Sequence, residues 1–280
     1  MKKISRRSFL AAAGLSVAAL ALTACGGSAS SVASSVASSA ASSAAASTSA
    51  AAGELTTVEA GKLTMATNAA FPPYEMTTDA GDFEGIDIET AQAIADKLGL
   101  ELQIDDMDFD AALLSVQQGK ADIVMAGVTV TDERKAVMDF SDSYATGIQS
   151  IIVPEGSDIA SPDDLAGKKI GTQRGTTGFI YCSDDYGDDN VIGFDDGATA
   201  VQNLLAGKVD CVVIDNVPAQ EYVKANAGLT ILDTEYANED YAIGLAKDNT
   251  ALQEALNKAL AELKADGTIQ SIIDKYIPAK

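Results

Sequence analysis

The sequence contains no histidine among its 280 residues. This absence excludes catalytic triads with an imidazole base, histidine general bases and histidine ligands of metal ions. Cysteine is scarce as well. After a leader-like first segment only Cys182 and Cys211 remain, and two cysteines are too few for a structural zinc site. The sequence therefore predicts a protein with no bound metal and no cofactor.

Basic residues are few, with 19 lysines and arginines against 41 aspartates and glutamates, for a formal net charge of −22 at pH 7. Nucleic-acid binding needs a basic surface, so this balance argues against it. No stretch after residue 24 is both apolar enough and long enough to span a membrane. The hydrophobic content of 47% supports a folded core, and the length suits one large or two medium domains.

Residues 1–24 have the pattern of a secretion signal, with a basic start, an apolar run from Phe9 to Leu22 and small residues before Cys25. The alternative is a buried helix of a soluble core. The sequence Leu-Thr-Ala-Cys that ends at Cys25 resembles a bacterial lipoprotein box, which implies cleavage before Cys25 and lipid attachment to its sulfur. Residues 5–10 resemble a twin-arginine export signal, so both that route and the Sec route stay open.

Residues 25–54 consist mostly of serine and alanine. Such a segment cannot bury enough surface to fold, and we interpret it as a flexible tether. The chain is therefore predicted to be a folded body, beginning at residue 55, that a lipid anchor holds outside the cell.

In the body, apolar runs that end in small or polar residues alternate with helical patterns, which predicts βαβ units and parallel sheets. Strands are expected at 63–67, 100–104, 123–125, 169–172, 191–194, 211–214, 229–232 and 241–246. Helices are expected at 86–98, 109–118, 198–206, 252–266 and 269–276. The alternation starts again after residue 150, which suggests a second unit of similar design.

A weak internal repeat supports that division, because residues 119–127 match residues 207–215 in sequence. Chance similarity is the alternative. In open parallel sheets, ligands bind beyond the carboxyl ends of the strands. Four such ends carry polar or small residues that we expect to converge on one cleft: Asn68, Gly127 to Thr131, Gln173 to Thr177, and Asp215.

The segment that follows the strand at 123–125 is a candidate site for a carboxylate. Small residues end the strand, Thr129 adds a hydroxyl, and a cap at Thr131 or Asp132 begins a short helix that carries Arg134 in its first turn. The planar guanidinium pairs with a carboxylate through two parallel hydrogen bonds. The alternative is a surface helix with a solvated arginine.

A return of the chain to the first unit would give two crossings, near 145–149 and 238–242, and two extended crossings make a hinge. The predicted domains are therefore lobe 1, with residues 55–145 plus 241–280, and lobe 2, with residues 146–240.

Several motifs resemble those of the extracellular solute-binding proteins of amino-acid ABC importers, family 3. They are Phe71-Pro-Pro-Tyr-Glu75, Gly85-Ile-Asp-Ile-Glu89, the segment 126–134, Asp139-Phe-Ser-Asp142 and Gly267-Thr268. The resemblance covers essentially all of 55–280, with Thr90 at a position where the family usually has an aliphatic residue. It implies an α/β, two-lobed periplasmic-binding-protein-like fold of type II. Each lobe would be a mostly parallel sheet flanked by helices, joined to the other by a two-strand hinge.

The family implies binding without chemistry. The closing lobes would trap an L-amino acid and deliver it to the membrane permease of an ABC importer. The expected partners are this ligand, the permease subunits and the membrane, reached through the lipid anchor, and the protein is expected to be an extracytoplasmic monomer.

The resemblance also implies roles for single residues. Arg134 would pair with the ligand carboxylate, helped by Thr129 and by the backbone amide of Thr177. Gly127 and Asp215 would take the ligand ammonium group. For Asp215 the alternative is a helix cap.

The predicted walls of the site are two aromatic residues, Phe71 and Phe109, although Phe109 could instead be ordinary helix core. Asn68 and Gln173 would face the tip of the ligand side chain. The remaining residues of the predicted ligand-binding set are Ala126 and Thr176.

An uncharged pocket tip favours a neutral polar or small ligand, because a buried charge without a partner is costly. Relatives that take cationic amino acids usually carry a carboxylate at the position of Asn68, and Gln173 occupies a common lysine position. Glu75 could still reach a cation, or it could be structural.

Two other functions stay in view. An enzyme on the same fold, such as a cyclohexadienyl dehydratase, would need an acid–base group in the cleft, and without histidine only a carboxylate, a lysine or a tyrosine could serve. A receptor ectodomain would be expected to continue into a membrane span. For Cys182 and Cys211 we predict one disulfide bridge in lobe 2, with two buried free thiols as the alternative.

Overall fold

The computed structural model describes residues 55–277. The predicted secretion signal, the lipidation site at Cys25 and the whole of the serine- and alanine-rich linker lie outside the described residues. Within the described part of the chain, every helix is too short or too polar to cross a membrane.

The first sheet has five strands in the order β5-β1-β6-β14-β7. Its strands are β1 (Lys62–Thr67), β5 (Glu101–Asp106), β6 (Ile123–Val124), β7 (Met138–Phe140) and β14 (Gly244–Ala246). Strand β1 pairs in parallel with β5 and β6, whereas β14 is antiparallel to both of its neighbours. All strands except β14 therefore run in one direction, as the sequence predicted.

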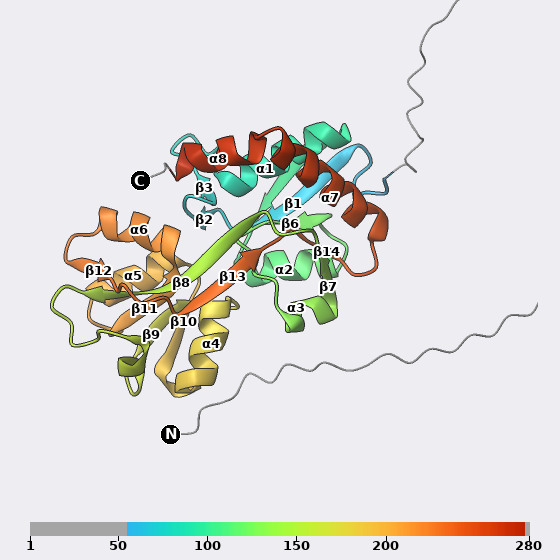
Figure 1. Cartoon of the computed structure of the whole chain (residues 1–280). Coiled ribbons are helices and arrows are strands. Elements are labelled where there is room, and N and C mark those ends of the chain that lie inside the picture. The colour runs from blue at the N-terminus through green and yellow to red at the C-terminus, as the bar shows by residue number, and fades with distance from the viewer. Residues whose placement is uncertain (1–54, 278–280) are drawn as a thin grey trace, which may run out of the picture. The chain divides into compact units, whose positions relative to one another are not determined.

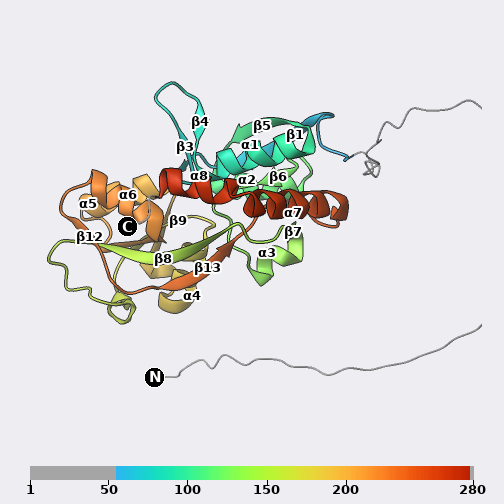
Figure 2. The same ribbon diagram turned by 45° about the horizontal axis from the view of Figure 1, so that its top comes forward.

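Five helices cover this sheet: α1 (Ile86–Leu98), α2 (Phe109–Gln117), α3 (Asp132–Val137), α7 (Thr250–Ala265) and α8 (Thr268–Tyr276). Successive side chains of a strand point to opposite faces. In β1, Leu63 and Met65 pack against α1, α7 and α8, whereas Ala66 packs in the cluster that contains α2. Figures 1 and 2 show α1, α7 and α8 side by side. We call this sheet with these helices lobe 1.

The second sheet has six strands, in the order β10-β9-β11-β8-β12 with β13 also paired to β8. They are β8 (Ala145–Pro154), β9 (Ile170–Gln173), β10 (Val191–Phe194), β11 (Cys211–Asp215), β12 (Leu229–Ile231) and β13 (Ala237–Tyr241). Strand β8 alone is antiparallel to its neighbours. The predicted mostly parallel sheet is thus found here as well.

Three helices accompany the second sheet: α4 (Thr177–Tyr186), α5 (Gly197–Leu205) and α6 (Asn216–Ala225), with short 3-10 turns at Pro162–Leu165 and Asp188–Asn190. Alternate residues of β11 again serve two cores. Val212 and Ile214 pack with α5 and α6, and Val213 packs in the cluster that contains Cys182 of α4. We call this sheet with these helices lobe 2.

Lobe 1 carries a small additional sheet whose strands were not among those expected from the sequence. Its strands are β2 (Ala70–Phe71), β3 (Glu75–Thr77) and β4 (Phe83–Glu84). Gly85 joins it to α1 at a φ of 133°, and a Cβ there would lie 2.2 Å from the Tyr74 carbonyl oxygen. Only glycine permits this close approach, which holds Glu75 against the start of α1.

Strands β8 and β13 form the connection between the lobes. They pair antiparallel over five residues, from Ala145 with Tyr241 to Gln149 with Ala237. The chain enters β8 after β7 of lobe 1 and leaves β13 towards β14 of lobe 1, as Figure 1 shows. All described residues belong to one compact unit. The lobe boundaries near residues 145 and 241, and bending at these strands, stay predictions.

The predicted disulfide bridge is wrong, because Cys182 and Cys211 are both buried free thiols. They lie in one apolar cluster of lobe 2, where each packs as a small hydrophobic side chain. Burial raises the pKa of each thiol to about 12. Both are therefore held in the unreactive thiol form.

Candidate functional site

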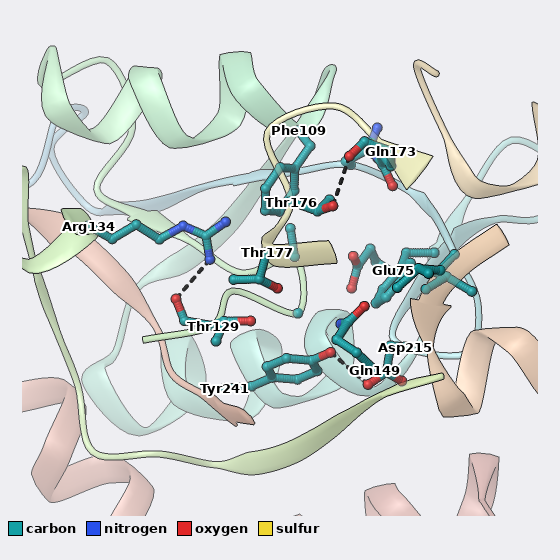
Figure 3. A pocket seen from close by; sticks show the side chains of 16 residues that line it. Glu75, Phe109, Thr129, Arg134, Gln149, Gln173, Thr176, Thr177, Asp215 and Tyr241 are labelled. Carbon is teal, nitrogen blue, oxygen red and sulfur yellow. Dashed lines mark hydrogen bonds between the residues drawn. The ribbon is translucent and has the colours of Figure 1, made fainter. Parts of the chain in front are cut away.

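A pocket of about 470 Å³, including the part open to solvent, lies where the two lobes face each other. All of the residues predicted to bind the ligand line it: Asn68, Phe71, Phe109, Ala126, Gly127, Thr129, Arg134, Gln173, Thr176, Thr177 and Asp215. Figure 3 shows most of these side chains around the pocket. Their contact with a ligand stays a prediction.

Five further residues line the pocket and were not in the predicted set: Glu75, Gln149, Val213, Ile214 and Tyr241. Val213 and Ile214 directly precede Asp215, so their position could have been inferred from it. Gln149 and Tyr241 lie in the strands that connect the lobes. No sequence pattern indicates which side of those strands faces the pocket.

Arg134 lies in the first turn of α3, where the Thr131 hydroxyl accepts a hydrogen bond from its backbone amide at 3.2 Å. The Arg134 side chain is 8% exposed. Its Nη1 donates to the carbonyl oxygen of Thr129 at 2.8 Å, and its Nη2 donates to the carbonyl oxygen of Gly175 in lobe 2 at 3.1 Å. The alternative of a surface helix with a solvated arginine is thereby ruled out.

No ion pair among the described residues includes Arg134. Burial lowers the pKa of its guanidinium, while the charge of nearby Glu239 opposes that shift. The guanidinium lies over the Phe109 ring, 5.4 Å from the ring centroid. A buried guanidinium with only neutral partners is suited to bind a carboxylate.

The start of α4 adds to this anion site. Thr176 caps the helix by accepting from the Phe179 amide at 3.3 Å, and its own hydroxyl donates to the Gln173 carbonyl oxygen at 2.8 Å. Thr177 is the first residue of the helix and is buried. The first amides of a helix favour an anion, so α4 and Arg134 present positive ends to the same part of the pocket.

Asp215 provides a negative charge from lobe 2, at the end of β11, and is 1% exposed. One carboxylate oxygen accepts from the Val217 amide at 3.0 Å and thereby caps α6. The other accepts from the Ile148 amide at 2.9 Å and from the Tyr241 hydroxyl at 2.8 Å. Asp215 is therefore both a helix cap and a pocket residue.

The pKa of the Asp215 carboxyl is raised to about 6, chiefly by burial, and the hydrogen bonds from Tyr241 and the backbone limit that rise. At pH 7 the carboxylate is thus ionised. It offers a fixed anion to an ammonium group in the pocket.

Gly127 follows β6 in lobe 1 and has a φ of +54°. A Cβ at this position would lie 2.9 Å from the Phe71 ring, so the pocket wall requires glycine. The Gly127 amide donates to the Asp87 carboxylate at 3.0 Å. Its carbonyl oxygen is therefore the group that it can present to a ligand.

The two predicted aromatic walls differ in their surroundings. Phe71 stacks on Tyr74 with ring centroids 5.7 Å apart and also packs against the core of lobe 2. Phe109 packs in the core of lobe 1 beside α2 and lines the pocket at the same time. The core alternative and the pocket prediction for Phe109 thus both describe its position.

Apart from the bonds made by the connecting strands β8 and β13, three hydrogen bonds between described residues join the lobes around the pocket. Gln173 Nε2 donates to Asn68 Oδ1 at 2.9 Å, and the Tyr222 hydroxyl donates to the Ala70 carbonyl oxygen at 3.1 Å. The third is the bond from Arg134 to Gly175. Asn68 and Gln173 therefore contact each other across the cleft. The sequence predicted that both face the tip of the ligand side chain.

Glu239 of β13 is a buried carboxylate behind the anion site. One of its oxygens accepts from the Thr129 hydroxyl at 3.1 Å and from Gln149 Nε2 at 2.9 Å. It therefore links β13 to lobe 1 through Thr129 and to β8 through Gln149. The described residues include no cluster of cysteine, aspartate or glutamate side chains arranged to hold a metal ion.

The chain is similar to known proteins over most of its length. The family described as bacterial extracellular solute-binding proteins, family 3, matches residues 63–279. The L-cystine-binding protein TcyJ of Escherichia coli K12 is 33% identical over 225 residues, which cover 79% of this chain and 84% of that protein. ABC transporter arginine-binding protein 1 of the same strain is 30% identical over 224 residues, which cover 78% of this chain and 92% of the relative.

A solved structure, that of an ancestral arginine-binding protein bound to glutamine, shares the fold with a TM-score of 0.75. The two chains are 42% identical, and the match covers 78% of this chain and 99% of that chain. The two-lobed α/β fold predicted from the sequence is thereby confirmed.

Proposed function

Because the chain belongs to the bacterial extracellular solute-binding proteins of family 3, we propose that it captures an L-amino acid between its lobes and delivers it to an ABC permease. The family binds solutes and does not transform them. The dehydratase alternative is therefore set aside.

The observation that carries this proposal is the pair of buried opposite charges at one pocket. Arg134 comes from lobe 1 and Asp215 from lobe 2, and both line the pocket. An α-amino acid carries the matching pair, a carboxylate and an ammonium group on one carbon. A zwitterion that contacts both lobes stabilises the closed arrangement by its differential affinity for it. The names of the relatives, which bind cystine and arginine, support the same ligand class.

We further propose that the side chain of the ligand is neutral and polar. Asn68 and Gln173 carry uncharged amides and meet across the pocket. Amides form hydrogen bonds with polar groups, but they do not neutralise a buried charge. Phe71 and Phe109 would hold the aliphatic part of the side chain from two sides.

The proposed setting is the outer face of the cell membrane. The lipoprotein-like sequence before Cys25 supports cleavage there and attachment of a lipid, with the serine- and alanine-rich linker as the tether. The anchored monomer would then present its closed lobes to the permease subunits in the same membrane.

The test is a panel of all common L-amino acids, with cystine and ornithine, against the purified protein after unfolding and refolding to remove carried-over ligand. At about 1,000 times its dissociation constant a ligand adds roughly 4 kcal/mol to stability. For a body of this size each kcal/mol raises Tm by about 2–4 °C. We expect such a shift with one or a few neutral polar amino acids.

Two neighbouring substitutions of α3 sharpen the test. Arg134→Ala should abolish the shift, whereas Lys135→Ala should preserve it, because Lys135 is exposed and pairs only with Asp132 of the same helix. Flat melting curves across the whole panel would refute the amino-acid assignment. A dominant preference for arginine or lysine at neutral pH would refute the neutral side chain.

A further inference from the structure

Glu75 is a buried carboxyl group that the proposed contacts to the amino-acid backbone do not use. It lies in β3, lines the pocket and is 0% exposed. As a carboxylate it has no hydrogen-bond donor for either oxygen among the described residues. Figure 3 shows its carboxylate pointing towards the interior of the pocket. Buried polar groups are nearly always paired, so this one needs a partner.

The nearest charged neighbour of Glu75 is a second acid, Asp87 of α1, which is also 0% exposed. Fixed donors hold the Asp87 carboxylate, because the Tyr144 hydroxyl lies 2.7 Å from it and the Gly127 amide lies 3.0 Å from it. These donors favour the ionised form of Asp87. Of the two acids, Glu75 is therefore the one that keeps a proton.

The remaining titratable groups around Glu75 do not neutralise the pair. They are Tyr74 beside it, Asp106 of β5, Tyr144 before β8 and Tyr222 of α6. None of them is basic, and no ion pair among the described residues includes Glu75 or Asp87. Burial, and then the charge of Asp87, raise the pKa of Glu75 well above its usual value.

We propose that Glu75 and Asp87 hold one proton between them and that Glu75 reads the tip of the ligand side chain. In the neutral form the Glu75 hydroxyl donates to Asp87, and its other oxygen accepts a hydrogen bond from the ligand. A carboxamide or a hydroxyl supplies that donor without a net charge. This inference rests on the proposed binding of an amino acid and specifies how its side chain is selected.

A cationic side chain would bind at the same place with a different proton balance. The O–H bond of Glu75 breaks, the proton passes to solvent, and the resulting carboxylate pairs with the guanidinium or ammonium group. Binding of a cation is thus coupled to release of a proton, whereas binding of a carboxamide is not. Cationic ligands should therefore gain affinity relative to neutral ones as the pH rises.

The experiment is calorimetric titration of the purified full chain with L-glutamine and with L-arginine between pH 7 and 8.5, above the range in which Asp215 titrates. Each titration is run in two buffers of different ionisation enthalpy, which gives the number of protons released. We expect release approaching one proton with arginine and none with glutamine. The affinity ratio of arginine to glutamine should rise with pH by up to about tenfold per unit, the limit set by linkage to one proton.

Glu75→Gln removes the proton and keeps the shape of the side chain. In this variant the proton release with arginine should disappear and the affinity ratio should no longer depend on pH, because the glutamine side chain does not titrate. Glu84→Gln is the matched control, because Glu84 lies in the adjacent strand β4 of the same small sheet and is exposed. It should titrate like the unchanged protein.

The outcomes separate this inference from the proposed function. Amino-acid binding with a pH-independent affinity ratio and no proton release would overturn the role of Glu75 and leave the proposed function intact. The same holds if arginine and lysine fail to bind at every pH while neutral ligands bind. Proton release that persists in Glu75→Gln would assign the proton to another group. Absence of binding by any amino acid would overturn the proposed function itself.

Discussion

The two lobes have the same sheet design but contribute opposite charges to the pocket. Each sheet contains one reversed strand, β14 in lobe 1 and β8 in lobe 2. The repeated sequence ends at Gly127 after β6 in one lobe and at Asp215 of β11 in the other. At these equivalent strand ends, lobe 1 presents a backbone group to the pocket and lobe 2 presents a carboxylate.

The cation of the site has no counterpart in the repeat. Arg134 is carried by α3, a short helix of lobe 1 that follows the strand end by several residues. The repeated framework thus brings equivalent strand ends to one cleft, and the residues that differ between the lobes make the two halves complementary. The first strands illustrate the same relation, because Asn68 follows β1, Gln173 ends β9, and the two amides meet at 2.9 Å.

Asp215→Asn removes the charge of lobe 2 and should give the largest effect. Truncating one partner of a buried charge pair costs roughly 2–5 kcal/mol of binding, so the ligand should bind about thirtyfold to several thousandfold more weakly. Stability should fall as well, because asparagine has one acceptor oxygen, whereas Asp215 uses one oxygen for the Val217 amide and the other for the Ile148 amide and the Tyr241 hydroxyl. Isothermal titration and urea unfolding measure the two quantities.

Asp196→Asn is the matched control for that substitution. Asp196 caps α5 in the same lobe by accepting from the Thr199 amide at 2.6 Å, and it does not line the pocket. The affinity of the Asp196→Asn variant for the ligand should equal that of the unchanged protein. Equal losses in both variants would show that lobe 2 contributes a cap and not a charge.

The pH dependence of stability should reveal an acid in each lobe. Burial is the main cause that raises the pKa of both Asp87 in lobe 1 and Asp215 in lobe 2 to about 6. Between the unfolded pKa, near 4, and about 6, the folded state binds more protons than the unfolded state. The ligand-free protein should therefore gain stability as the pH falls from 7 to 4.5, by roughly 1–3 kcal/mol for each acid.

Ligand affinity should follow the opposite trend below pH 6, because protonated Asp215 no longer attracts the ammonium group. Urea unfolding at several pH values, with and without ligand, measures both trends. Asp215→Asn should remove the share of this gain that is due to Asp215 and leave the part due to Glu75 and Asp87 in lobe 1. A gain that is unchanged in this variant would contradict the assignment to lobe 2.

The strands and helices that the sequence predicted are those in which the hydrophobic residues recur with a clear period. The helix at 86–98 agrees with α1, and of the two candidate caps of the short helix, Thr131 or Asp132, the structure has Thr131. Strand β8 was missed except for its crossing segment, because a strand in the middle of a sheet is buried on both faces and lacks alternation. The expected strand at 241–246 is interrupted, since β13 ends at Tyr241 and β14 begins at Gly244.

The pocket residues that were predicted lie at strand ends or in recognisable motifs, as Asp215 and Arg134 do. The missed residues depend on how the lobes approach each other. Gln149 and Tyr241 reach the pocket only because β8 and β13 pair beside it. Such contacts between distant segments leave no local signal in the sequence, and neither does the burial of Glu75 against Asp87.

Gly175→Ala should weaken the contact between the lobes without changing either pocket charge. Gly175 has a φ of +72°, and a Cβ there would overlap with the Asp110 carboxylate of lobe 1. Closure should therefore be hindered, and we expect about tenfold weaker binding by titration. Gly207→Ala is the control, because Gly207 has a similar φ of +68° in the same lobe and nothing within 4 Å of its Cβ position. Equal losses in both variants would exclude a specific effect on closure.

Glu239→Gln should give the smallest effect and the opposite sign. The negative charge of Glu239 lies near Arg134 and counteracts the attraction of that guanidinium for a ligand carboxylate. Glutamine keeps an oxygen for the Thr129 hydroxyl, so binding should tighten by about three- to tenfold, or roughly 1 kcal/mol. Asp240→Asn, at the adjacent exposed position of β13, should leave affinity unchanged. Weaker binding in Glu239→Gln would mean that the carboxylate serves the site mainly by orienting Thr129 and Gln149. Strand β13 would then help to arrange the residues of lobe 1 that bind the ligand carboxylate, and the charge of Glu239 would not weaken that binding.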